Sequence, residues 1–327
     1  MPHLRMSRLG SQPNVLRLSC GVDARKRSES MHYASSGVFR RALEDQFIAI
    51  SLHSGVSLAR LRKLAVHERF LARLITAQPG AWQLKGAFAL QLRLPRSPYL
   101  LKNIDLQLVT PHGDVYTRLQ QAAALDLNDC FGFEVLPAER QMPGAFGGTR
   151  YPLWCQLDGR VFENLHVDAG PANPLYTPVD SLATFPLLAF AGLGPLSLPC
   201  YPAVMQLAEK LHTLTRPREA GEHSRVKEFV DIVQLSAMVD SSAADLLQAL
   251  QAVFSCAAAH PLPARVPPLA PGWAVDYGEM AAELGLKETR LARAHAQLQQ
   301  FLDPVLAGQG GDLFWDSRRG LWAQPPA

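Results

Sequence analysis

The sequence lacks paired cysteines and long apolar runs. Its five cysteines are scattered and form no CxxC pair, which argues against a disulfide scaffold and against a zinc knuckle. No apolar run approaches the ~20 residues that a helix needs to cross a bilayer, so no membrane span is expected. Scattered thiols are typical of a reducing compartment. The sequence therefore predicts a cytoplasmic protein that does not act in a membrane.

Three widespread catalytic signatures are also missing. The chain contains no GxSxG, no GxxxxGK[ST] and no GxGxxG, which removes the usual hydrolase, P-loop and dinucleotide-binding interpretations as far as motifs can. His166, His212 and His223 show no metal-ligand spacing, so a histidine-bound metal is not expected either. A catalytic site must therefore be sought in other combinations of residues.

The composition is that of an ordinary globular protein, but its charge is uneven. The chain has 327 residues, 48% hydrophobic and 19% charged, enough for about two domains. The net charge is only +3, yet residues 1–41 carry eight Lys or Arg against two acidic residues. This basic arm is either a solvated tail or a phosphate-binding segment. Met31 is an alternative to Met1 as the start, because regular patterning begins only after it.

Beyond the arm, the pattern changes from mixed α/β to helical. Phe39, Leu43, Phe47 and Ile50 recur at helical spacing, and Ser57 is a suitable N-cap for a second helix. A proline-rich bridge over 171–202 separates the two halves, and the last twenty residues are expected to be irregular. We predict strands over 82–85, 103–109, 131–135, 151–157 and 161–168, and later helices over 203–214, 225–238, 241–254, 279–285 and 288–302.

The first candidate site lies at the ends of predicted strands. Asn103 and Asp105 are two residues apart on a strand and so share a face. Gly86 opens a predicted helix, where backbone N–H groups can hold a phosphate. Asp168 ends another strand, and sheet pairing would bring it beside Asp105. Two carboxylates and a phosphate cradle would suit a Mg²⁺-nucleotide site, although a turn glycine and strand-end aspartates are more often structural.

The second candidate site lies on two predicted helices. Lys210 is on the first helix, and Asp231 is on the helix that begins near Arg225. One interpretation is a surface ion-pair network of Arg225, Lys227, Glu228 and Asp231, which contributes little to stability. The other interpretation is that Lys210 binds a triphosphate and is oriented by an acidic residue of the adjacent helix. The residues alone leave both open.

Several sequence blocks occur in an order that resembles a known family. The most specific are Gln206–His212 and Arg225–Asp231, and the others lie over 70–74, 84–90, 102–106, 159–162 and 167–168. In this order they resemble the AbiEii/AbiGii nucleotidyltransferase toxins, which are polymerase-β-like nucleotidyltransferases. The resemblance covers about residues 38–306.

The resemblance implies a fold and a domain plan. The fold would be α+β, with a nucleotidyltransferase-type mixed sheet flanked by helices and followed by a C-terminal helical domain. We expect a basic, disordered arm over 1–35 and a nucleotidyltransferase core with N-terminal helices over 36–175. A helical domain over 176–306 would complete the nucleotide pocket, and an irregular tail would follow over 307–327.

The resemblance also implies roles for individual residues. The metal ligands would be Asn103, Asp105 and Asp168, and the catalytic residues would be Asp105, Asp168, Lys210 and Asp231. The nucleotide-binding residues would be Lys85, Gly86, Ala87, Lys210, Arg225 and Lys227. The cofactor would be Mg²⁺ or Mn²⁺, with an NTP as substrate.

The implied activity is transfer of a nucleotide from the NTP to an acceptor, tRNA or another RNA, by a toxin with a separately encoded antitoxin.

The sequence departs from the family pattern at Asn103, where Asp is usual, at Ala87, where a second Gly or a Ser is usual, and over 99–102. Asn offers a carbonyl oxygen to a cation but no negative charge. An impaired relative that binds nucleotide or RNA is therefore the alternative, and an unrelated helical interaction protein is a third possibility.

Overall fold

The computed structural model describes residues 33–94, 101–109, 114–142, 148–170, 179–217, 225–270 and 272–325. The predictions for the basic arm up to residue 32, for His223 and for residues 99 and 100 fall outside these ranges. The described chain divides into two compact units, the first ending at Cys200 and the second beginning at Tyr201.

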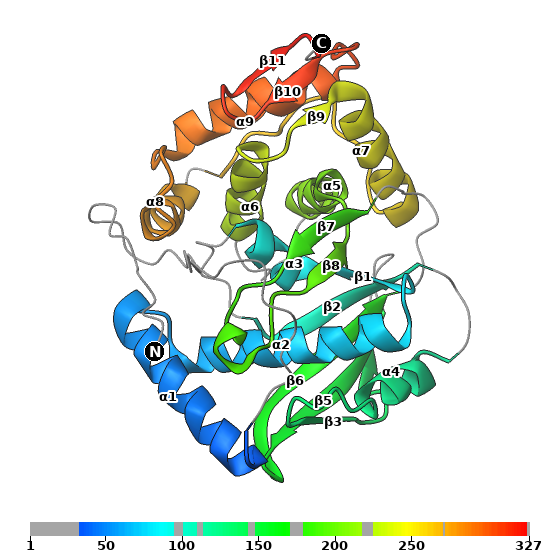
Figure 1. The fold of residues 1–327 in the computed structure, drawn as a ribbon. Helices are drawn as coiled ribbons and strands as arrows, with labels where there is room; N and C mark the ends of the chain where they lie inside the picture. Colours follow the sequence, from blue (N-terminus) through cyan, green and yellow to red (C-terminus); the bar gives the residue numbers. More distant parts are fainter. Residues whose placement is uncertain are drawn as a thin grey trace. The chain divides into compact units, whose positions relative to one another are not determined.

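The first unit is built on a mixed sheet with the strand order β3-β5-β6-β2-β1-β8-β7, and β4 pairs with β5 outside this path (Figure 1). Strands β2 and β6 run parallel, whereas β1–β2 and β5–β6 are antiparallel. The strands are β1 (Trp82–Lys85), β2 (Asn103–Leu108), β3 (Phe131–Val135), β4 (Arg140–Gln141), β5 (Thr149–Leu157), β6 (Arg160–Gly170), β7 (Asp180–Ala183) and β8 (Ser197–Cys200).

Helices of the first unit bury one face of this sheet. On β5, Tyr151, Leu153, Cys155 and Leu157 are buried, while the residues between them are more exposed. This alternation is the mark of a strand with one packed face. The helices α1 and α2 contact β5 and β6 respectively, and α4 contacts β3 (Figure 1). The helices are α1 (Ser36–Ser54), α2 (Leu58–Ala77), α3 (Gly86–Arg93) and α4 (Val115–Ala123).

A buried ion cluster fastens α2 to the start of β3. The Asp129 carboxylate accepts hydrogen bonds from Arg69 Nε at 2.7 Å and from Arg73 Nη1 and Nη2 at 2.9 and 2.7 Å. The Arg73 side chain is 1% exposed and that of Asp129 is fully buried. Buried charges are tolerated only when they are paired and hydrogen-bonded. The cluster therefore fixes the position of β3 against α2.

The second unit is helical with one small sheet. Helix α5 contacts both α6 and α7, and these helices carry Leu207, Phe229 and Leu250, which are fully buried. Trp315 and Trp322 pack against Phe301 of α9. The elements are α5 (Ala203–Thr215), α6 (Val226–Ser236), β9 (Ser241–Ser242), α7 (Ala243–Ala257), α8 (Trp273–Glu283), α9 (Leu291–Leu306), β10 (Phe314–Asp316) and β11 (Leu321–Ala323).

The α+β fold class is confirmed, and so is the predicted N-cap of α2, while α7 is capped in the same way. Ser57 accepts a hydrogen bond from the backbone N–H of Arg60, and Ser242 accepts one from that of Asp245. Among the helices of the described ranges, none has the length and apolar character needed to cross a bilayer.

Two expectations about irregular segments were wrong. The proline-rich bridge over 171–202 contains β7 and β8, which join the first sheet because Leu198 and Cys200 are buried there. The first compact unit ends at Cys200, whereas the boundary expected from the sequence lies at residue 175. The tail over 307–327 contains β10 and β11, which pair with each other while β10 also pairs with β9. Trp315 is 4% exposed, so burial of its ring orders this segment.

Candidate functional site

Five charged residues form one row across the sheet of the first unit. The backbone register pairs Lys85 with Asp105, Asp105 with Asp168, Asp168 with Arg150, and Arg150 with Arg140. Directly paired residues project from the same face of a sheet. We call these five residues the charged row. The register thus brings Asp105 and Asp168 side by side, with basic residues beyond each of them.

Gly86 allows the Asp105 carboxylate to approach the start of α3. Its φ of 65° lies in the left-handed region, and a Cβ added there would overlap the Asp105 carboxylate. The carboxylate accepts a hydrogen bond from the backbone N–H of Ala87. A helix N-terminus favours negative charge because its first N–H groups have no partner within the helix. The predicted phosphate cradle therefore holds a protein carboxylate in this structure.

Asp105 is held in a setting that resists ionisation. Burial raises the pKa of Asp105, with the neighbouring Asp168 as a second cause, to about 6. The ammonium of Lys85, the N–H of Ala87 and the guanidinium of Arg150 act in the opposite direction. Two carboxylates that face each other repel, and a cation between them would relieve that repulsion. The pair is therefore suited to a positively charged ligand.

Three donors already occupy Asp168. Arg150 Nε donates to Oδ1 at 2.7 Å, and Arg150 Nη2 donates to Oδ2 at 2.6 Å. Asn103 Nδ2 donates to Oδ2 at 2.9 Å. The hydrogen bonds to Asp168 also raise the pKa of Arg150 above its ordinary value. Arg150 was not predicted from the sequence as a site residue, although it makes the strongest contact of the predicted acidic pair.

The backbone of Asn103 is held separately. His67 of α2 is fully buried, with Nε2 3.1 Å from the carbonyl oxygen of Asn103 and Nδ1 2.6 Å from that of Lys63. Burial lowers the pKa of His67 to about 4. The imidazole is therefore neutral near pH 7. It links α2 to the beginning of β2.

The donor atoms of the charged row fit a hard divalent cation only in part. Asp105 and Asp168 supply carboxylate oxygens, which Mg²⁺ prefers. Asn103 directs its amide nitrogen to Asp168. In the described ranges, no group of three or more His, Cys, Asp or Glu could hold a metal ion. Two carboxylates suffice for Mg²⁺ when substrate phosphates complete the coordination, so the set fits a cation that is bound together with a nucleotide.

The second candidate site lies on α5 and α6 of the second unit. Lys210 Nζ is 2.7 Å from Glu228 Oε2 and 2.8 Å from Asp231 Oδ2. The Asp231 side chain is fully buried, whereas that of Lys210 is 23% exposed. Burial raises the pKa of Asp231 to about 8, and an ammonium 2.8 Å away acts in the opposite direction by favouring the charged form. The predicted pairing of Lys210 and Asp231 is present, with Glu228 as a further partner.

Arg225 directly precedes α6 and Lys227 lies in its first turn, and the surroundings of these two predicted residues differ. Arg225 is 6% exposed, and its guanidinium donates to the backbone carbonyls of Arg216 and Pro217. It thereby joins the end of α5 to the beginning of α6. Lys227 is exposed. The structure thus gives Arg225 a structural contact and leaves the Lys227 side chain at the surface.

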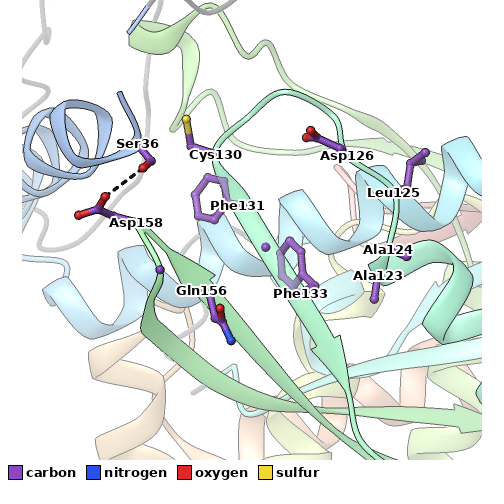
Figure 2. Close-up of a pocket in the computed structure, with 12 residues that line it drawn as sticks. Ser36, Ala123, Ala124, Leu125, Asp126, Cys130, Phe131, Phe133, Gln156 and Asp158 are labelled. Carbon is purple, nitrogen blue, oxygen red and sulfur yellow. Dashed lines mark hydrogen bonds between the residues drawn. The ribbon is translucent and has the colours of Figure 1, made fainter. Parts of the chain in front are cut away.

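A cavity of about 510 Å³ lies elsewhere in the first unit (Figure 2). Phe131, Phe133 and Gln156 line it, and Ser36 Oγ donates to Asp158 Oδ1 at 3.0 Å at its rim. None of the residues that the sequence predicted for catalysis, nucleotide binding or metal binding lines this cavity. It is therefore separate from the charged row.

Comparisons with known proteins complete these observations. MenT4, a nucleotidyltransferase toxin from Mycobacterium tuberculosis H37Rv, is 16% identical, with a TM-score of 0.48, 83% of this chain covered and 98% of that one. JHP933 from Helicobacter pylori is 13% identical, with a TM-score of 0.39, 75% of this chain covered and 94% of that one. No curated protein matches the chain. The model of the family described as "Nucleotidyl transferase AbiEii toxin, Type IV TA system" matches residues 69–307. The chain belongs to this family of nucleotidyltransferase toxins.

Proposed function

We propose that this protein transfers a nucleotide from an NTP to an RNA acceptor, with tRNA as the expected acceptor, and that Mg²⁺ or Mn²⁺ is required. It would act as the toxin of a two-component system with a separately encoded antitoxin. The observation that carries the proposal is the pairing of Asp105 with Asp168 beside Gly86, within the region that matches the family.

The acidic pair has a defined part in this proposal. Asp105 and Asp168 would hold the cation, which neutralises charge on the triphosphate and lowers the pKa of an attacking hydroxyl. The absence of a side chain at Gly86 leaves room for the Asp105 carboxylate at the start of α3. The ammonium of Lys85 and the backbone N–H of Ala87 both favour the charged form of Asp105.

The residues of α5 and α6 would bind the triphosphate. Lys210 is the candidate for a phosphate contact because its ammonium is partly exposed, and Asp231 orients it at 2.8 Å. Lys227 adds positive charge at the surface, and Arg225 holds the ends of the α5–α6 connection. Catalysis by such a site depends on positioning and on stabilisation of charge on the phosphates.

An RNA-labelling assay tests the proposal. Purified protein is mixed with each of the four labelled NTPs, Mg²⁺ or Mn²⁺, and total tRNA. We expect label on RNA with at least one nucleotide, a loss of about 10²-fold or more in Asp105→Asn, and no change in Lys287→Ala, an exposed control. A folded protein that labels no RNA with any nucleotide contradicts the proposal.

One observation favours a second function, that of an impaired relative that binds nucleotide or RNA. Asn103 brings no charge and donates to Asp168, which Arg150 also engages. In that case tRNA binding persists without transfer and weakens steeply with salt, and Asn103→Asp restores transfer. Absence of both NTP and RNA binding would exclude this second function as well.

A further inference from the structure

The contact between Arg150 and Asp168 is built into the sheet. The two residues lie directly opposite each other on the antiparallel strands β5 and β6. Their side chains are 14% and 13% exposed. The guanidinium reaches the carboxylate with two hydrogen bonds, the geometry that an arginine fork makes with a carboxylate. The pair is therefore more than a chance encounter of two flexible surface side chains.

The same contact interferes with binding of a cation at Asp168. Arg150 and Asn103 engage both carboxylate oxygens. A carboxylate offers about four lone-pair positions, and these donors take three of them. A divalent cation that coordinates both oxygens of Asp168 therefore has to replace at least one of these donors. Because Arg150 already supplies positive charge to the acidic pair, a second cation also meets repulsion at close range.

We propose that Arg150 is the resident counter-ion of Asp168 and that a divalent cation binds Asp168 only by displacing its guanidinium. The identification of Asp168 as a metal ligand rests on the proposed function. Arg150 then makes the nucleotide-free protein a weak binder of metal. The cation binds well only together with a nucleotide, whose phosphates offer the released guanidinium a new partner. Arg150 is in this sense a positioning residue that couples the two ligands.

Binding of Mn²⁺ alone tests the coupling, because it needs no transfer of nucleotide. The affinity is measured by the paramagnetic resonance signal of free Mn²⁺ for the wild type and for Arg150→Gln. We expect Arg150→Gln to bind Mn²⁺ at least tenfold more tightly in the absence of nucleotide. Arg62→Gln is the matched control, because Arg62 makes a similar two-bond contact with Glu44 away from the charged row. Its Mn²⁺ affinity should equal that of the wild type.

Two further variants establish that the gain passes through Asp168. In the double variant Arg150→Gln/Asp168→Asn, the gain in Mn²⁺ affinity should disappear. Arg150→Lys keeps the positive charge but loses the fork, so its affinity should lie between those of the wild type and Arg150→Gln. It also serves as the test if Arg150→Gln does not fold, as judged by its thermal melting.

Nucleotide supplies the second readout. A non-hydrolysable NTP analogue should raise the Mn²⁺ affinity of the wild type much more than that of Arg150→Gln, because the variant has no guanidinium to release. A folded Arg150 variant that binds Mn²⁺ no better than the wild type overturns the inference, whether or not RNA is labelled. Gain of Mn²⁺ binding without RNA labelling by the wild type would overturn the proposed transfer activity and leave the role of Arg150 in place.

Discussion

Arg150 and Asp168 face each other across β5 and β6 and are joined by two hydrogen bonds of 2.7 and 2.6 Å. Lys210 and Asp231 form a comparable pair in the second unit, 2.8 Å apart. In each unit, an acidic residue of the candidate site is thus compensated by a basic residue of the same unit. Removal of either partner leaves a charge in surroundings that solvate it poorly. This gives each pair a measurable effect on stability besides any effect on activity.

Substitution of Gly86 tests the geometry around Asp105. Gly86→Ala places a Cβ where the Asp105 carboxylate lies and requires a positive φ from a residue that disfavours it. We expect the carboxylate to shift and RNA labelling to fall by about 10²-fold, since a displacement of about 1 Å at a reacting centre has effects of that size. The measurement is the initial rate of labelling with the preferred NTP.

Gly80→Ala is the matched control for this substitution. Gly80 has a φ of 73°, close to that of Gly86, but beyond its chain neighbours no atom of the described residues lies within 4 Å of an added Cβ. Both variants should lose about 1 kcal/mol of unfolding free energy from backbone strain. Only Gly86→Ala should lose activity, and an equal loss in Gly80→Ala would show that strain rather than contact with Asp105 is responsible.

Much of this arrangement could be predicted from local sequence. The apolar spacing of Phe39, Leu43, Phe47 and Ile50 identified the buried face of α1, and all four are buried. The polar–apolar alternation after Asn103 predicted β2, which spans Asn103–Leu108. These signals are local, because helical and strand periodicities are properties of a few consecutive residues. The positions of Asp105 on β2 and of Gly86 at the start of α3 were predictable for the same reason.

The partner of Asp168 could not be predicted in this way. The Asp158-Gly159 turn signals a two-residue hairpin between β5 and β6, and Leu157 does pair with Arg160. Counting back from this turn would place Arg150 opposite Val167, on the buried face. The irregularity between Cys155 and Gln156 shifts the register by one residue and places Arg150 opposite Asp168 instead. A bulge changes which side chains share a face of the sheet. The residues around Cys155 and Gln156 do not predict a bulge at this position.

A double substitution tests the Lys210–Asp231 pair. Lys210→Ala leaves the buried Asp231 without its cation, and we expect a loss of about 3–5 kcal/mol of unfolding free energy. Lys210→Ala/Asp231→Asn removes the stranded charge as well and should recover most of that loss. Denaturant titration of the wild type, the two single variants and the double variant gives the coupling energy. Additive effects would show that the pair is not coupled in the folded protein.

The same double variant separates stability from activity. It should remain folded, yet label RNA no better than Lys210→Ala, because the proposed phosphate contact is absent from both. Lys287→Ala, at an exposed position, should match the wild type in both measurements. Recovery of labelling along with stability would argue against a direct contact between Lys210 and the triphosphate.

The buried cluster around Asp129 provides a prediction that is independent of activity. Asp129→Ala leaves Arg69 and Arg73 charged, buried and without their acid. We expect a loss of about 3–5 kcal/mol of unfolding free energy. Glu44→Ala breaks the more exposed contact with Arg62 and should cost less than about 1 kcal/mol. Equal losses in a denaturant titration would contradict a special role of the buried cluster.

Glu68 makes the stability of the first unit depend on pH. It is 2% exposed, and its carboxyl group bonds to the side chain of Thr184, while Oε1 has no hydrogen-bond partner among the residues that the structure describes. Burial raises the pKa of Glu68 from 4.5 to about 7, against the smaller opposing effects of Thr184 and Arg69. The folded state therefore holds its proton over a pH range where the unfolded chain has released it. Stability that depends on this proton is lost as the pH rises from about 4.5 to about 7.

Glu68→Gln removes this titration and keeps the shape of the side chain. The variant should gain stability relative to the wild type as the pH rises, by about 2–3 kcal/mol between pH 5 and pH 8, from a difference of roughly 2.5 pKa units. Any cost of burying the amide is the same at both pH values and cancels in this comparison. Melting temperatures at the two pH values measure the change, with Glu134→Gln as an exposed control that should track the wild type. If the melting temperatures of Glu68→Gln and the wild type differed by the same amount at both pH values, Glu68 would have the same pKa in the folded and unfolded states.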